Sequence, residues 1–167
     1  MPLMSLSEAC LFVASTREQG RIIVFTNGVF DLLHPGHVRY LTAARRLGDV
    51  LVVGLNSDRS VRANKGSDRP LIPELERAEV LAALDAVDLV VVFDEDTPLA
   101  VITALQPDVL VKGADWAADA IVGREIVEAR GGRVVRVPVL SGYSTSAIVE
   151  TIKAGSRSAG RAHSGSS

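Results

Sequence analysis

Five short apolar runs alternate along the chain with longer segments whose apolar residues recur every three or four positions. The runs are rich in valine, isoleucine and leucine and cover residues 21–26, 49–56, 87–93, 107–113 and 133–139. They lack the polar alternation of half-exposed strands, which predicts strands buried on both faces. The segments of helical period are 34–47, 73–84, 98–105 and 120–130. Such strand–helix repeats predict a three-layer, doubly wound α/β fold with a parallel sheet of about five strands.

Three segments fall outside this repeat. Within the first 20 residues, the pattern predicts a helix over 5–19 that leans on the sheet of a single domain, residues 1–155. Residues 56–70, NSDRSVRANKGSDRP, are polar and long for a connection, which predicts a mobile functional loop. Residues 156–167 are rich in serine, glycine and alanine and are expected to be a disordered tail.

The composition narrows the function classes. The chain has 167 residues, 47% of them hydrophobic, which provides for one sizeable core. Its formal net charge of −2 gives no broad basic surface, so neither nucleic acid nor a membrane is expected as a partner. The lone Cys10 excludes an internal disulfide, and the first residues do not form a secretory leader, so a cytoplasmic location is expected.

The stretch GVFDLLHPGH, residues 28–37, lies where the first strand ends and the first long helix begins. Gly28 permits a sharp turn and Pro35 suits a first helical turn, so free amides and the positive end of the helix dipole meet there. His34 and His37 lie on the same side of that turn and can hold one phosphate group. Two alternatives are a simple histidine cap and a zinc site formed by Asp31, His34 and His37, although no further histidine or cysteine nearby completes such a site.

A second helix start follows in SGYSTSAIVETI. Ser144, Thr145 and Ser146 directly precede a helical pattern, so hydroxyls and free amides meet there too, although a helix cap alone would account for one of them. The chain contains no GxxxxGK[ST], no GxGxxG after the first strand and no GxSxG. The sequence therefore predicts a phosphate site that uses imidazoles in place of a glycine-rich loop.

The decapeptide resembles the GxFDxxHxGH signature of the cytidylyltransferase-like nucleotidyltransferases, and the similarity extends from Arg21 to about Lys153. NSDRSVRANKGSDRPLIPELERAEVLAAL, PDVLVKGADW and GGRVVRVPVLSGYSTSAIV resemble, in order and spacing, the adenylyltransferase part of enzymes that make ADP-activated heptose. Many of those enzymes are fused to a sugar kinase, so a stand-alone adenylyltransferase with a separate kinase is expected. A looser similarity connects the chain to the glycerol-3-phosphate cytidylyltransferases.

The resemblance implies transfer of AMP from ATP to a heptose 1-phosphate, with Mg²⁺ on the leaving phosphates and with ADP-heptose and pyrophosphate as products. It implies His34, His37 and Lys65 as catalytic residues and Asp31, Arg62 and Arg69 as residues of the sugar phosphate site. The residues that it implies for ATP are Thr26, Asn27, Gly28, Val29, Phe30, Lys112, Gly113, Asp115, Ser144, Thr145 and Ser146. Relatives are commonly dimers, so a homodimer is expected.

Several of these assignments have local alternatives. Lys65 could be a solvated surface lysine, and Arg62 and Arg69 compete for the sugar phosphate. Asp31 could organise the first turn by accepting backbone amides or by orienting His34. Arg77 could form a structural ion pair with a neighbour such as Glu74. These alternatives concern individual residues and leave the overall assignment unchanged.

The nucleotide base and the chemistry also leave alternatives. Ala114 occupies a position where the heptose branch usually has a second glycine, and Trp116 is either a stacking wall for the base or a lid on the core. Alternative functions are a CTP-dependent glycerol-3-phosphate cytidylyltransferase, a nucleotide-binding module without catalysis, and a metal-binding domain.

Overall fold

The computed structural model describes residues 3–139 and 144–161, with side chains up to residue 154. The strands are β1 (Ile23–Gly28), β2 (Val50–Asn56), β3 (Leu89–Phe93), β4 (Val109–Gly113) and β5 (Arg133–Val137). The helices are α1 (Leu6–Glu18), α2 (Pro35–Arg45), α3 (Asp58–Lys65), α4 (Glu74–Ala82), α5 (Leu99–Leu105), α6 (Arg124–Ala129) and α7 (Thr145–Arg161), with a short 3-10 turn, η1, at Ala118–Ala120.

The five strands form one parallel sheet in the order β3-β2-β1-β4-β5. The chain winds outward from β1 to β3 on one side and then returns to place β4 on the other side of β1. This arrangement confirms the predicted doubly wound α/β fold. It also places β1 and β4 side by side at the point where the winding reverses.

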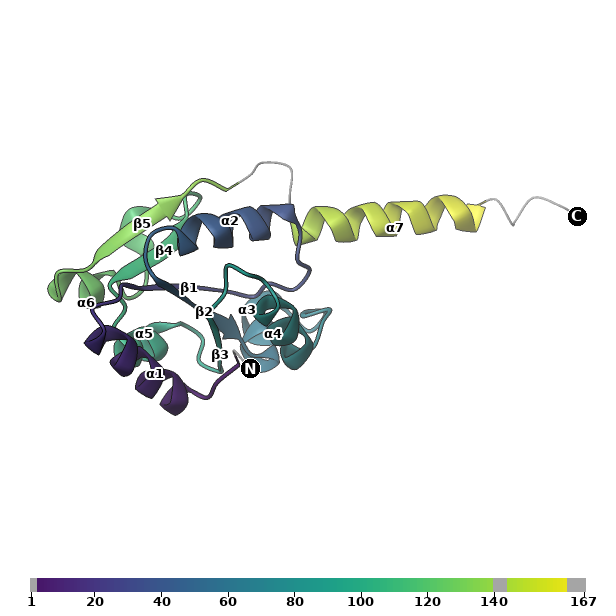
Figure 1. The fold of residues 1–167 in the computed structure, drawn as a ribbon. Helices are drawn as coiled ribbons and strands as arrows, with labels where there is room; N and C mark the ends of the chain where they lie inside the picture. The colour runs from purple at the N-terminus through teal and green to yellow at the C-terminus, as the bar shows by residue number, and fades with distance from the viewer. Residues whose placement is uncertain (1–2, 140–143, 162–167) are drawn as a thin grey trace, which may run out of the picture.

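Helices cover both faces of the sheet (Figure 1). On one face, α1, α5 and α6 pack over a core that includes Phe25, Val52 and Leu110. On the other face, α2 and α4 pack over Val24, Val53 and their neighbours. The strands β2 and β4 are buried along their whole length, as expected for apolar strands that are covered on both sides.

The polar stretch 56–70 is not a continuous loop, because α3 occupies its first half. Ser57 caps this helix by accepting a hydrogen bond from the amide of Ser60, and Asp58 provides a carboxylate in the first turn. Gly66 ends the helix with a φ of 94°, a conformation that favours glycine. The sequence prediction overlooked a short helix whose apolar content is too low to produce a clear period.

Two other helix boundaries differ from the sequence prediction. The helix expected over 120–130 begins only at Arg124, because Gly123 has a φ of 87° and separates it from η1. The helix α7 extends to Arg161, beyond Ser156, where the disordered tail was expected to begin. Figure 1 shows α7 projecting away from the sheet, and the rest of the expected tail, 162–167, lies outside the described residues.

Candidate active site

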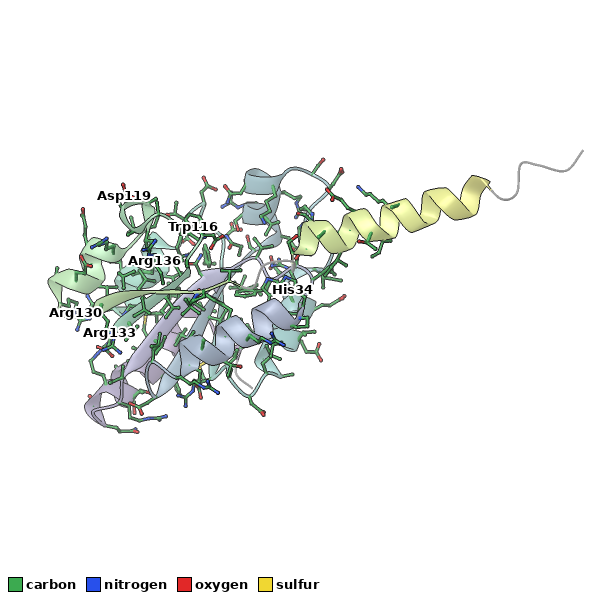
Figure 2. All side chains as sticks on the ribbon, turned by 90° about the horizontal axis from the view of Figure 1, so that it is seen from above. His34, Trp116, Asp119, Arg130, Arg133 and Arg136 are labelled. Atoms are coloured by element: carbon green, nitrogen blue, oxygen red, sulfur yellow. The ribbon has the colours of Figure 1, made fainter. Side chains whose placement is uncertain are left out.

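The carboxyl ends of β1 and β4 define the crevice in which a doubly wound sheet binds its ligands. The turn after β1 carries the two histidines, and the segment after β4 carries Asp115 and Trp116. The start of α7 comes to the same edge, because the Thr145 hydroxyl donates to the carbonyl oxygen of Leu32 at 3.4 Å. In Figure 2, His34 accordingly lies close to the beginning of α7.

Gly28 is required by the packing of the turn that follows β1. A Cβ at this position would lie 2.9 Å from the ring of Phe30. Phe30 has a φ of 47°, unusual for a residue with a side chain, and its ring meets the imidazole of His37 edge-on with centroids 5.3 Å apart. The glycine therefore makes room for the aromatic ring, and the ring fixes one side of His37.

The two imidazoles are stacked at the start of α2. Their centroids are 3.8 Å apart at an interplanar angle of 21°. His34 is the N-cap, and its Nδ1 accepts a hydrogen bond from the amide of His37 at 3.4 Å, while Pro35 occupies the first turn of the helix. Since Nδ1 of His34 is an acceptor, its neutral form carries the proton on Nε2.

Both imidazoles are held in the neutral form at neutral pH. Burial lowers the pKa of His34. Burial lowers the pKa of His37 to about 4, assisted by the neighbouring His34 and by the positive charge of Lys65, and opposed by a backbone hydrogen bond at Leu32. Within the described part of the chain, the buried Nδ1 of His37 has no hydrogen-bond partner.

Lys65 acts on the histidine pair through its charge, from a different element. It is the last residue of α3, it is exposed, and its charge is close enough to depress the pKa of His37. The pair and the lysine together provide donors and positive charge at the start of α2. This combination suits a multiply charged phosphate.

The hydroxyls at the start of α7 are already partly used. The Ser144 hydroxyl accepts a hydrogen bond from the amide of Ala147 at 3.0 Å, and Thr145 is bonded to Leu32. Ser146 follows within the first turn. The structure thus brings all three beside the histidine turn and gives the cap role to Ser144. Their contact with phosphate stays a prediction.

Residues at the end of β4 and directly after it form the other side of the crevice. Lys112 is 7% exposed and donates to the side-chain oxygen of Asn27, and burial lowers its pKa to about 8 against the opposing charge of Asp115. Its ammonium lies 5.3 Å from the ring centroid of Trp116. Trp116 is 50% exposed, so it is a wall of the crevice and not a lid on the core. Gly113 leaves space for the Asp115 carboxylate, which a Cβ would overlap.

Comparison with known proteins agrees with this geometry. The model of the family described as cytidylyltransferase-like matches residues 25–151. The chain belongs to the cytidylyltransferase-like family. The matched residues include every element that lines the crevice, from β1 to the start of α7.

The chain is similar to longer curated proteins and to a solved structure. It is 61% identical over 140 residues to the bifunctional protein HldE of Citrifermentans bemidjiense, covering 84% of this chain and 29% of that protein. It is 56% identical over 154 residues to the bifunctional protein HldE of Geotalea uraniireducens, covering 92% of this chain and 31% of that protein. The chain therefore spans less than one third of these relatives. The crystal structure of a lipopolysaccharide core biosynthesis protein from Thermoplasma volcanium matches with a TM-score of 0.63 and 31% identity, covering 73% of this chain and 100% of that one.

Four residues that were predicted to contact ligands make hydrogen bonds or an ion pair with other parts of the protein. Thr26 is fully buried, and its hydroxyl donates to the carbonyl of Val111 at 3.0 Å and contacts the Tyr40 hydroxyl at 2.8 Å. The carbonyl of Val29 accepts from Arg77. The Thr26 hydroxyl therefore links β1 to β4 below the crevice. The carbonyl of Val29 is hydrogen-bonded to a side chain of α4.

Asp31 and Arg69 are the other two. They form an ion pair at 2.6 Å, and the second carboxylate oxygen of Asp31 accepts the amides of Leu71 and Ile72 at 2.8 and 3.0 Å. Asp31 thus does accept backbone amides, as one alternative expected, but from a distant segment. Asp31 and Arg69 hold the chain after α3 against the histidine turn, and their contact with a sugar phosphate stays a prediction.

The contact of Arg62 with a sugar phosphate stays a prediction. Arg62 lines a groove between α3 and α4 that also includes Arg59, Glu74 and Asp94. The described residues contain no group of three or more histidines, cysteines or carboxylates able to hold a metal ion, so the alternative of a zinc site lacks support. Among the same residues, none of the helices has the length and apolar character needed to cross a bilayer.

Sequence reasoning missed the role of Arg77. Its guanidinium is fully buried and pairs with Asp58 at 2.7 Å, not with Glu74, whose carboxylate accepts the Asp58 amide at 2.6 Å. The only local signal was an arginine on the apolar side of α4, one position before the buried Ala78.

Proposed function

We propose that the protein is a nucleotidyltransferase that transfers AMP from ATP to a heptose 1-phosphate and releases pyrophosphate. The observation that carries this proposal is the stacked pair His34 and His37 after β1, with the charge of Lys65 near enough to act on His37, in a cytidylyltransferase-like chain. The choice of sugar rests on the similarity of the downstream segments to heptose enzymes and on the neighbour named for lipopolysaccharide core biosynthesis. We place the reaction in the cytoplasm, where ATP is available.

The reaction needs charge stabilisation and positioning more than proton removal. An oxygen of the sugar phosphate forms a bond to the α-phosphorus of ATP, and the bond from that phosphorus to the bridging oxygen of pyrophosphate breaks. The attacking phosphate is ionised at neutral pH because its second pKa is about 6, so no catalytic base is required. In-line transfer gathers negative charge on the phosphoryl oxygens and on the leaving group.

The histidine pair acts on the α-phosphoryl group. Each neutral imidazole donates one N–H at the start of α2. Lys65 carries the full positive charge toward the leaving pyrophosphate from the end of α3. Lys112 and Trp116 border the side of the crevice where the base and ribose lie.

Mg²⁺ fits this site only through the nucleotide. Among the described residues no cluster of carboxylates or histidines is able to hold it, and the Asp31 carboxylate is already occupied by Arg69 and two amides. Phosphate oxygens and water suit Mg²⁺, which would accompany ATP and offset its charge. The protein groups then orient the resulting complex.

The experiment is a pyrophosphate-release assay with ATP or CTP, each offered with a heptose 1-phosphate or with glycerol 3-phosphate. We expect release only with ATP and the heptose phosphate. Release from CTP with glycerol 3-phosphate alone would favour the cytidylyltransferase alternative. Binding of ATP without release under any combination would favour a nucleotide-binding module.

We further propose that the protein is a homodimer through the outer face of α2 and α4. This face holds an apolar groove whose lining includes Val38, Val80 and Leu84 and which reaches His34 and Pro35 at the histidine turn, so the interface borders the active site. The exposed Arg39 lies on its α2 side and the exposed Glu79 on its α4 side. A two-fold axis through the groove places α2 of one copy on α4 of the other, so opposite charges face each other around an apolar centre.

Analytical ultracentrifugation tests this dimer. Val80 is 51% exposed, so Val80→Glu should leave the fold intact and convert a dimer to a monomer. Leu99→Glu is the matched control, because Leu99 is 45% exposed on α5 at the opposite face of the sheet and should leave the dimer unchanged. A wild-type protein that sediments as a monomer at assay concentration would refute the proposal.

A further inference from the structure

Arg77 is a fully buried guanidinium that lies outside the crevice. A buried charge is costly unless it is paired and fully hydrogen-bonded. Its Nε donates to the carbonyl of Ile72 at 2.8 Å, and its Nη1 donates to the carbonyls of Val29 and Asn56 at 2.7 and 3.0 Å. Its Nη2 donates to the carboxylate of Asp58 at 2.7 Å. One side chain thus bonds to acceptors in three separate segments of the chain, at Val29, at Asn56 and Asp58, and at Ile72.

Two of those segments lead directly to the histidine pair and to Lys65. Val29 lies in the turn after β1, five residues before His34. Asp58 is the first residue of α3, the helix that ends at Lys65. Arg77 is therefore a direct physical connection between the histidine turn and the helix that carries the lysine.

A second connection joins the same two parts of the molecule. Asp31, in the histidine turn, pairs with Arg69 and accepts the amides of Leu71 and Ile72. Ile72 is consequently held on both sides, since its amide donates to Asp31 and its carbonyl accepts from Arg77. The helix α3 is anchored to the histidine turn before its first turn and after its last.

We propose that Arg77 is a positioning residue which, through Asp58 and Val29, holds Lys65 at the distance from the histidine pair that nucleotidyl transfer requires. This inference rests on the proposed function. Arg77 touches no reacting atom, so its contribution to turnover passes through Lys65. Displacing a catalytic group by about 1 Å can lower turnover by about 10²-fold, so small changes in the hydrogen bonds of Arg77 should affect turnover.

A double-mutant cycle tests the proposal. Arg77→Lys keeps the charge but lacks the planar fork that serves four acceptors, and Lys65→Ala removes the lysine that it positions. We expect Arg77→Lys to lower kcat about 10-fold and Lys65→Ala about 10²-fold, with the double variant close to Lys65→Ala alone. Arg124→Lys, in the exposed pair between Arg124 and Glu128, is the control and should keep wild-type turnover.

The outcomes separate this inference from the proposed function. Losses that multiply in the double variant, or wild-type turnover in a folded Arg77→Lys variant, would overturn the role of Arg77. If Arg77→Lys does not fold, Asp58→Asn breaks the same link at a side chain that is 23% exposed, and the same cycle with Lys65→Ala applies. If the wild-type protein releases no pyrophosphate, the proposed function fails, and the cycle measured in ATP affinity by calorimetry still decides whether Arg77 acts through Lys65.

Discussion

The histidine pair and Lys65 serve the same crevice but are held in opposite ways. The imidazoles are neutral, partly buried and fixed by a helix cap, by stacking and by the edge of Phe30. Lys65 is charged and exposed, and its position depends on anchors at the two ends of α3. The comparison indicates two different roles. The fixed, neutral imidazoles hold the phosphoryl group that reacts, and the more distant Lys65 offsets its negative charge.

The largest effect is expected at the histidines. His37→Asn should lower kcat by about 10²–10³-fold, because it removes a fixed donor to the charged transition state. His34→Asn should have a similar effect. Pyrophosphate release measures both, and Arg46→Ala at the exposed end of α2 is the control. A His37→Asn variant that retains activity within a few-fold of wild type would contradict the role given to the fixed histidine pair.

A smaller effect, which depends on the positive charge of the side chain, is expected at Lys65. Lys65→Ala should lower turnover by about 10²-fold and weaken ATP binding, whereas Lys65→Arg, which keeps the charge, should recover much of both. Turnover and calorimetry at low and high salt check this, with Lys153→Ala on the exposed surface of α7 as the control. Equal losses in the alanine and arginine variants would show that charge is not what Lys65 supplies.

Gly28→Ala should disturb the histidine pair and leave the contribution of Lys65 unchanged. The added Cβ would meet the Phe30 ring at 2.9 Å, so the ring must move and loses its contact with His37. We expect kcat to fall about 10-fold with little change in the contribution of Lys65. Introducing Lys65→Ala into the wild-type protein and into the Gly28→Ala variant measures this, and a Lys65 effect that differs between the two would link the two regions more closely than proposed.

The smallest expected effect concerns stability and pH. The pKa of His37 is lowered to about 4 from 6.5, so the unfolded chain binds more protons between these values. This histidine therefore lowers the free energy of unfolding as the pH falls from 6.5 toward 4. His37→Gln should flatten that decline, measured by urea unfolding at about pH 7 and about pH 5. Identical pH profiles for the two proteins would mean that His37 is not buried as a neutral group.

The fold and the histidine turn could be predicted because their signals are local. Apolar period separates buried strands from helices, and GVFDLLHPGH contains its turn, cap and imidazoles within ten residues. The helix α3 was missed because its buried residues are few, although the Ser57–Asp58 start is a typical cap signal. That the chain belongs to the cytidylyltransferase-like family confirms the resemblance on which the residue roles were based.

The roles of Asp31, Arg69 and Arg77 could not be predicted. Asp31 and Arg69 are 38 positions apart, and Arg77 and Val29 are 48 apart. No periodicity reports a contact between segments so distant in sequence. An arginine in a polar segment looks the same whether it faces a substrate phosphate or a buried carboxylate, and only the folded chain distinguishes the two.

The most direct measurement is a crystal structure with a non-hydrolysable ATP analogue and Mg²⁺. The account predicts phosphate oxygens within hydrogen-bond distance of both His34 and His37, with Lys65 on the outer phosphates. A nucleotide bound elsewhere, or bound between β1 and β4 with both imidazoles remote from every phosphate, would contradict it.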